Sequence, residues 1–79
     1  MSESTFQRKL IKEYEAKGWT VIRLLQSNKA GYPDLLCLMP ERVLFIEVKS
    51  RTGKLSKVQE YRHAELRAAG FEVETIAEP

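Results

Sequence analysis

The stretch GYPDLLCLMPERVLFIEVKS, residues 31–50, decides the fold. It contains two apolar runs, 34–39 and 42–50, separated by a short segment with a proline. Such runs around a turn predict the two arms of a β-hairpin. Apolar residues on both faces of the second arm indicate a buried central strand. The same stretch nevertheless carries three charged residues whose presence needs a reason: Asp34, Glu47 and Lys49.

The register of the hairpin brings the two acids together. A turn centred on residues 39–42 places Asp34 directly opposite Glu47, with Cβ atoms roughly 4.5–5.5 Å apart. Lys49 follows Glu47 by two residues and so lies on the same face. Two carboxylates this close repel each other unless a cation lies between them. Two carboxylates, a backbone carbonyl and waters are ligands that suit Mg²⁺. The alternative is that the lysine only neutralises one acid while Asp34 caps the strand.

The rest of the chain predicts two helices and two more strands. Phe6, Leu10, Ile11 and Tyr14 form one apolar stripe of a helix that ends before a glycine. Ser56 and a glutamine three residues later form a capping box that opens a second helix. The predicted elements are helix 4–17, strand 19–25, the hairpin arms, helix 56–69 and strand 71–76.

This order, αβββαβ, predicts an α/β fold of the α+β kind with a mixed four-stranded sheet. The last two strands are joined through a helix, so they should be parallel, with a right-handed crossover. The hairpin makes the other pairings antiparallel. The sheet should be flanked by helices, with one on each face or both near one face.

Length and composition limit the class of protein. The 79 residues suffice for one domain, 1–79, with apolar and charged fractions typical of globular proteins. So small a domain buries only about 60% of its unfolded surface, and dimerisation would add burial. We expect no membrane span, no signal peptide, and no disulfide or zinc site from the single Cys37. These features favour a cytoplasmic protein.

The charged motif resembles the PD-(D/E)xK nuclease superfamily, in which Pro-Asp is followed by Glu-x-Lys. Within it, the chain is most similar to the VRR-NUC (virus-type replication-repair nuclease) family. The similarity extends over nearly the whole chain: G-x-P-D at 31–34, the E-V-K strand at 45–49, L-S-x-x-Q at 55–59, and Glu3 with Gln7 in the first helix. It implies a restriction-endonuclease-like αβββαβ core, in agreement with the elements predicted above.

The resemblance also implies roles for residues. Asp34, Glu47 and the Val48 carbonyl would bind Mg²⁺ or Mn²⁺, and Lys49 would be the catalytic lysine. Glu3 and Gln59 are two further catalytic candidates, although each also fits a purely structural role. Glu3 would reach the metal through water or serve a second metal, but an acid at a helix N-terminus is favourable by itself. Gln59 would orient Lys49 or the water, but it is also the capping-box partner. Glu13 is a weaker rival to Glu3, since a solvated acid explains it.

Polar and basic residues flank these candidates. The run 49–57 holds four cations and no acid. Arg23, together with polar residues of the 26–33 loop, flanks the metal-site loop and could also contact phosphates. Such side chains make phosphate contacts that carry no sequence information. Solvated loops are the alternative. The DNA-contact candidates are Ser27, Asn28, Lys29, Arg51, Lys54 and Lys57.

Three other residues invite a role. His63, the single histidine, lies in the middle of the second helix. We expect it to be a partly exposed helix residue rather than a general base. Trp19 and Phe71 each follow a helix-ending glycine and should pack in the core or in a dimer interface.

The resemblance therefore implies a Mg²⁺-dependent endonuclease that hydrolyses phosphodiester bonds of branched DNA. The stand-alone, phage-type members are small homodimers that cleave four-way DNA (Holliday) junctions, which would place the protein in a bacterial or phage-infected cell. A flap or nicking endonuclease with the same site is one alternative. The other is a catalytically inactive DNA-binding module, against which the intact Asp34, Glu47 and Lys49 argue.

Overall fold

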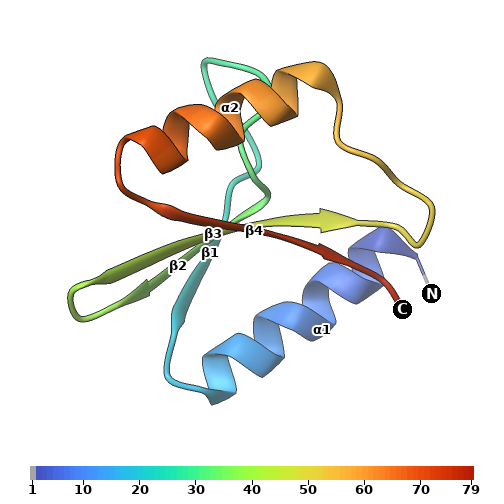
Figure 1. Cartoon of the computed structure of the whole chain (residues 1–79). Coiled ribbons are helices and arrows are strands. Elements are labelled where there is room, and N and C mark those ends of the chain that lie inside the picture. Colours follow the sequence, from blue (N-terminus) through green and yellow to red (C-terminus); the bar gives the residue numbers. More distant parts are fainter. Residues whose placement is uncertain (1) are drawn as a thin grey trace.

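The computed structural model describes residues 2–79 and contains the predicted order of elements (Figure 1). The elements are α1 (Glu3–Ala16), β1 (Thr20–Arg23), β2 (Leu35–Met39), β3 (Arg42–Lys49), α2 (Lys57–Ala68) and β4 (Glu72–Ala77). Their bounds differ from the predicted ones by a residue or two, mostly because the cap residues lie outside the helices. Among the described residues, no helix combines the length and the apolarity needed to cross a bilayer.

The four strands form one mixed sheet in the order β1-β2-β3-β4. β2 pairs antiparallel with both β1 and β3, and β4 pairs parallel with β3. The hairpin register runs from Met39 opposite Arg42 to Leu35 opposite Ile46. This is the register that places Asp34 opposite Glu47 at the next position. The predicted α+β fold and the predicted hairpin pairing are therefore confirmed.

The helices lie on opposite faces of the sheet, so the first of the two predicted arrangements holds (Figure 1). α1 buries Phe6 and Leu10 against one face. On that face β3 contributes alternate residues that are almost fully buried: Leu44, Ile46 and Val48. The core lies here, between α1 and the sheet, and it also contains Trp19, Leu35 and Cys37. Trp19 is thus a core residue and is not available for a dimer interface.

Both helices begin at serine caps. Ser2 Oγ accepts a hydrogen bond from the backbone N–H of Thr5. Ser56 caps α2, and the predicted reciprocal box with Gln59 is present. The first strand is shorter than predicted: β1 ends at Arg23, and Leu25 is 79% exposed. The chain therefore leaves the sheet earlier than its apolar pattern indicates.

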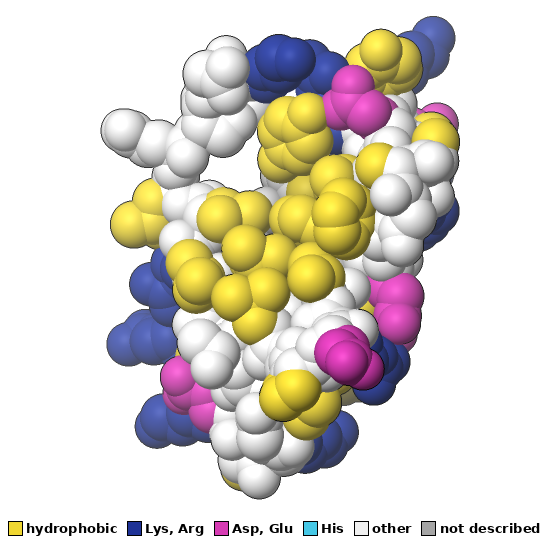
Figure 2. Space-filling view, turned by 90° about the vertical axis from the view of Figure 1, so that its left-hand side faces the viewer, with side chains coloured by type: hydrophobic (Ala, Val, Ile, Leu, Met, Phe, Trp, Pro, Cys, Tyr) yellow, Lys and Arg dark blue, Asp and Glu magenta, His cyan; other side chains and the backbone are white. Residues whose placement is uncertain are grey.

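The face that carries α2 is only partly covered. By the sheet register Ile22, Leu36 and Phe45 lie side by side on this face. Phe71 adds an edge-on ring contact to Phe45 at 5.9 Å between centroids. Ile22 and Phe71 are 42% and 40% exposed. Figure 2 shows apolar side chains gathered into one continuous surface on this side of the molecule. We call these four residues the open apolar face.

Candidate functional site

Asp34 is fixed at the start of β2 by two backbone contacts. Its Oδ2 accepts a hydrogen bond of 2.7 Å from the backbone N–H of Val48 on β3. Its carbonyl accepts one of 2.8 Å from the backbone N–H of Leu24, just beyond β1. The side chain therefore lies at the end of the hairpin, where the register brings Glu47 opposite it.

The preceding loop is packed onto α2, which positions Asp34 further. Gly31 has a φ of +94°, and a Cβ at this position would lie 2.8 Å from the Val58 carbonyl oxygen. Arg62 of α2 donates a 3.0 Å hydrogen bond to the Ala30 carbonyl, and the Tyr32 hydroxyl donates to Glu65. A side chain at residue 31 would push this loop off the helix. The glycine of the G-x-P-D motif is thus required by close approach and by backbone conformation.

Glu47 is a buried acid in the middle of the sheet, with 2% of its surface exposed. Burial, and after it the adjacent Asp34 carboxylate, raise its pKa to about 8. Lys49 opposes the shift. The predicted repulsion between two adjacent carboxylates is therefore present in the folded chain. Burial makes it stronger, because charges interact more strongly away from water.

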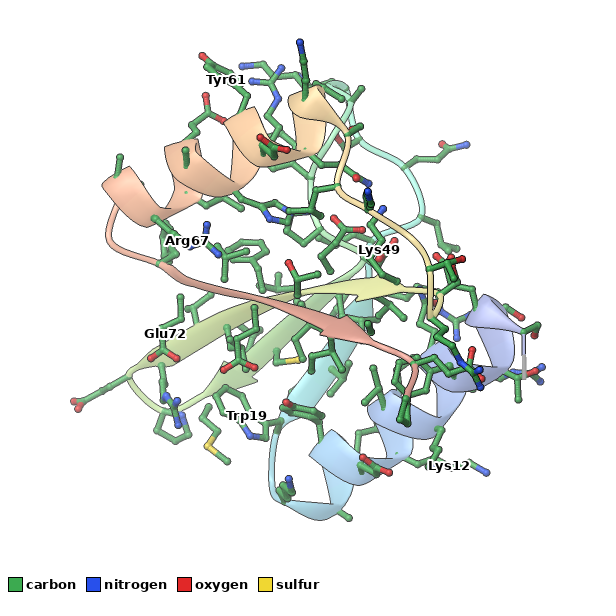
Figure 3. The ribbon with its side chains drawn as sticks, turned by 45° about the vertical axis from the view of Figure 1, so that its right-hand side comes forward. Lys12, Trp19, Lys49, Tyr61, Arg67 and Glu72 are labelled. Carbon is green, nitrogen blue, oxygen red and sulfur yellow. The ribbon has the colours of Figure 1, made fainter. Side chains whose placement is uncertain are left out.

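Lys49 and Gln59 join this pair from the strand and from α2. Lys49 Nζ donates a 2.9 Å hydrogen bond to Gln59 Oε1 and lies 3.9 Å from Glu47 Oε2. Gln59 Nε2 in turn donates to Glu47 Oε2 at 3.4 Å. The same Gln59 Oε1 accepts the backbone N–H of Ser56 in the capping box. Gln59 therefore caps the helix and contacts Lys49 at the same time. Figure 3 shows Lys49 in the space between α2 and the sheet.

His63 is the residue that sequence reasoning missed. We expected it to be partly exposed, but it is 1% exposed, and its Nε2 lies 3.1 Å from Glu47 Oε1. Burial lowers its pKa, and the charges of Arg67 and Lys49 lower it further, so the ring is neutral at pH 7. Its Nδ1 has no hydrogen-bond partner within the described residues. The available signal was spacing: His63 follows Gln59 by four residues and so lies on the same helix face.

Glu3 reaches the site more loosely. It lies in the first turn of α1, is exposed, and its charge contributes to the raised pKa of Glu47. Its rival Glu13 is exposed near the other end of the helix. The structure therefore brings Glu3, and not Glu13, near the acid pair.

The donor set suits a hard divalent cation. The residues available to hold it are Asp34, Glu47 and the carbonyl of Val48, all oxygen donors, and Mg²⁺ characteristically keeps several waters. Across residues 2–79, no group of three or more His, Cys, Asp or Glu side chains could hold a metal by itself. A site with two carboxylates is consistent with that finding. The raised pKa of Glu47 is the observation that favours a cation, since a positive charge would relieve the repulsion.

The predicted DNA-contact residues all lie in exposed loops or at the start of α2. Ser27 is partly engaged, because its hydroxyl accepts the N–H of Lys29 and donates to the carbonyl of Lys29. The remaining candidates, Asn28, Lys29, Arg51, Lys54 and Lys57, are exposed. Residues 27–29 belong to the loop packed on α2. Arg51 and Lys54 belong to the segment that joins β3 to α2, and Lys57 is the first residue of α2.

Comparisons with known proteins agree with this fold. The family model of the VRR-NUC domain matches residues 2–77. A solved VRR_NUC domain structure superposes with a TM-score of 0.85 at 29% identity, over 96% of this chain and 84% of that one. Hjc of Archaeoglobus fulgidus, a Holliday junction resolvase from an archaeal hyperthermophile, gives a TM-score of 0.70 at 27% identity. That match covers 90% of this chain and 65% of Hjc. No curated protein matches the sequence significantly.

Proposed function

Since this chain belongs to the VRR-NUC domain family of nucleases, we propose that it is a divalent-metal-dependent endonuclease that cleaves branched DNA as a homodimer. The observation that carries the proposal is the acid pair formed by the buried Glu47 and the half-buried Asp34, with Lys49 on the same face of β3. A fold that kept these residues only for stability would gain nothing from a buried carboxylate placed beside a second acid.

In this proposal Asp34, Glu47 and the Val48 carbonyl hold Mg²⁺ or Mn²⁺. When bound, such a cation polarises the scissile phosphate and lowers the pKa of a water molecule. The Val48 N–H fixes one oxygen of Asp34, which leaves the other side of the carboxylate to face the ligand. Glu3, at the edge of the site, would contact the ion through water.

Lys49 carries the chemistry that the chain itself supplies. Its ammonium group is held by Gln59 Oε1 and lies beside, but not in close contact with, Glu47. It is therefore free to donate a second hydrogen bond to a phosphate oxygen or to the attacking water. A positive donor held at this position stabilises negative charge as it develops on the phosphate oxygens, at no cost of reorganisation.

Gln59 and His63 position Glu47 rather than touching the substrate. His63 Nε2 holds Oε1, and Gln59 Nε2 holds Oε2. Both come from α2, one turn apart, so one rigid helix fixes both carboxylate oxygens. Hydrogen bonds of this kind to ligating side chains typically govern metal affinity.

Branched DNA is the substrate suggested by the similarity to Hjc, a Holliday junction resolvase. Two symmetric nicks in a four-way junction need two active sites related by a two-fold axis. The open apolar face supports a second copy as its occupant, since Ile22 and Phe71 remain 42% and 40% exposed in a single chain. The loop 27–29 and the segment 51–57 would contact phosphates beside each site.

The test uses labelled four-way, flap and linear duplex DNA with the purified protein, with and without Mg²⁺. We expect Mg²⁺-dependent paired cleavage of the four-way junction in preference to linear duplex. Preferred cleavage of the flap, or single nicks, would replace junction resolution with the flap or nicking activity. Binding without cleavage under any divalent metal would identify an inactive DNA-binding module. Sedimentation of the protein alone decides whether the chain is a dimer.

A further inference from the structure

The cations of this chain fall into two groups. Of the 13 lysines and arginines, five interact with an acid, a carbonyl or an aromatic ring of the fold: Lys17, Arg42, Lys49, Arg62 and Arg67. The remaining eight make no ion pair, side-chain hydrogen bond or ring contact within residues 2–79. Four of these eight are the predicted loop contacts Lys29, Arg51, Lys54 and Lys57. The other four lie elsewhere: Arg8, Lys9, Lys12 and Arg23.

These last four line one groove. It has a volume of about 590 Å³ and runs between α1 and β1. Its other lining residues are Thr5, Ile11 and Glu15, so four cations face one acid. All four cations are exposed, and Lys12 extends outward from α1 (Figure 3). The groove is thus open to a large ligand and has an excess of positive charge.

The arrangement does not stabilise the helix. Arg8 and Lys12 are four residues apart and Lys9 and Lys12 are three apart, and like charges at these spacings repel on a helix. Glu15 follows Lys12 by three residues, yet the two form no ion pair in the structure. An external anionic ligand would offset this repulsion.

The groove opens beside the candidate site. Arg23 pairs with Leu35, the residue after Asp34. Leu24, the residue after Arg23, donates its backbone N–H to the Asp34 carbonyl. At the other border, Thr5 lies one half-turn along α1 from Glu3. From Thr5 to Glu15 the helix spans about 15 Å at 1.5 Å per residue. One DNA strand rises 3.4 Å per nucleotide, so this length matches about four phosphates.

We propose that the groove between α1 and β1 binds the phosphate backbone of the DNA arm that leaves the active site, through Arg8, Lys9, Lys12 and Arg23. The inference rests on the proposed nuclease function and extends it, because none of the predicted phosphate contacts lies on α1 and Arg23 alone of the four cations was among them. It gives each protomer a second backbone track, as a branched substrate with diverging arms requires.

The competing hypothesis is that these cations protect an edge strand. β1 lies at the edge of the sheet, and charged side chains there discourage pairing with other chains. That role needs charge but no ligand, so the two hypotheses differ in the salt dependence of DNA binding.

The experiment measures the Kd of a labelled four-way junction against NaCl concentration in EDTA, by fluorescence anisotropy. The groove variant carries Arg8→Gln, Lys12→Gln and Arg23→Gln. The control variant loses the same charge at partnered positions, through Lys17→Gln, Arg42→Gln and Arg67→Gln. The logarithm of the association constant falls linearly with the logarithm of the salt concentration, and each phosphate contact contributes about −0.9 to that slope. The slope of the groove variant should therefore be shallower by about 2.7, and the control should keep the wild-type slope. The groove variant should melt no lower than wild type.

A groove variant with the slope of the control would overturn the inference and leave edge protection as the role of these cations. If the triple variant fails to fold, Lys12→Gln alone should lower the slope by about 0.9, and an unchanged slope would again reject the groove. Failure of the proposed function looks different, because wild type itself would then show neither junction binding nor Mg²⁺-dependent cleavage.

Discussion

The two faces of β3 have opposite properties although they alternate along one eight-residue strand. On the α1 side, Leu44, Ile46 and Val48 are at most 2% exposed and belong to the apolar core. On the α2 side, Glu47 is as deeply buried but carries a carboxylate, next to a second acid and a lysine. Equal burial thus serves packing on one face and concentrates charge on the other.

The difference separates the residues that stabilise the fold, on the α1 face, from the residues proposed to carry out the chemistry, on the α2 face. α1 packs over the apolar core, and burial of apolar side chains there supplies the main driving force for folding. α2 covers the other face only partly, and its deepest residue is a histidine bonded to an acid. Changes on the first face should therefore alter stability alone, and changes on the second should alter chemistry while folding survives.

The largest effect is expected from Asp34→Asn. It removes one of the paired charges yet keeps an oxygen that can accept the Val48 N–H. Loss of a metal ligand forfeits several kcal/mol of transition-state stabilisation, so Mg²⁺-dependent junction cleavage should fall about a thousandfold or more. Thermal stability above pH 8, where Glu47 is ionised in the wild type, should hold or rise, since repulsion is relieved.

The matched change on the other face is Ile46→Val, one residue from Glu47. It should cost about 0.5–1.5 kcal/mol of stability and leave the cleavage rate unchanged. Denaturant titration and single-turnover kinetics on both variants measure the contrast. Full activity in Asp34→Asn, or loss of activity in Ile46→Val at equal folding, would break the division between the faces.

Lys49→Ala should reduce turnover by about 100- to 1000-fold, the range for removing one preorganised donor to developing charge. Junction binding should change little, because Lys49 is half-buried and held by Gln59. Lys54→Ala in the exposed loop is the control, with weaker binding at unchanged turnover. If binding and cleavage fall in parallel in Lys49→Ala, the lysine is only a phosphate contact.

His63 tests the comparison between the two faces of β3 in a second way. Its contact with Glu47 lies on the charged face but is buried away from solvent. His63→Leu should weaken Mn²⁺ binding about 10- to 100-fold, the usual effect of losing a partner of a metal ligand. His63→Gln places an N–H donor within reach of Glu47 and should restore most of the affinity. Calorimetric titration with Mn²⁺ compares the three proteins. Equal Mn²⁺ affinity in wild type and His63→Leu would mean that His63 only packs in the interior and does not support Glu47 as a metal ligand.

The acid pair also makes a pH prediction for the metal-free protein. The pKa of Glu47 rises from an ordinary value of 4.5 to about 8 in the folded chain. The folded state therefore keeps a proton that the unfolded state releases. This contribution to stability is complete below pH 4.5 and is lost as the pH rises through 8.

Melting in EDTA across this window should show a falling Tm, and each kcal/mol corresponds to about 4–8 °C for a domain of this size. In Glu47→Gln, the fall of Tm with pH that Glu47 causes should be absent. A wild-type Tm that stays level or rises between these pH values would contradict the raised pKa of the buried Glu47.

Local patterns predicted the fold well because they acted at short range. The hairpin register followed from where the turn at residues 39–42 falls, and the start of the second helix followed from Ser56, whose hydroxyl accepts a backbone N–H three residues later. Asp34, Glu47 and Lys49 could be brought together from the sequence for the same reason, since one hairpin holds them all.

What escaped prediction depended on tertiary packing. His63 is polar and lies in the middle of a helix, and only the docking of α2 over Glu47 determines that it is buried. The groove cations belong to α1 and β1, and their grouping depends on which sheet face α1 covers. The sequence left that choice open. Trp19 was assigned to either the core or an interface, and the structure places it in the core beside Tyr14, at 6.3 Å between ring centroids.

The central claim is that the charged face of β3 is a divalent-metal site. Calorimetric titration of Mn²⁺ into wild type, Glu47→Gln and Ile46→Val tests it most directly, without DNA and without turnover. We predict saturable binding by wild type and by Ile46→Val, and no saturable binding by folded Glu47→Gln. Wild-type affinity in Glu47→Gln would contradict the account, because Mn²⁺ would then bind elsewhere on the protein.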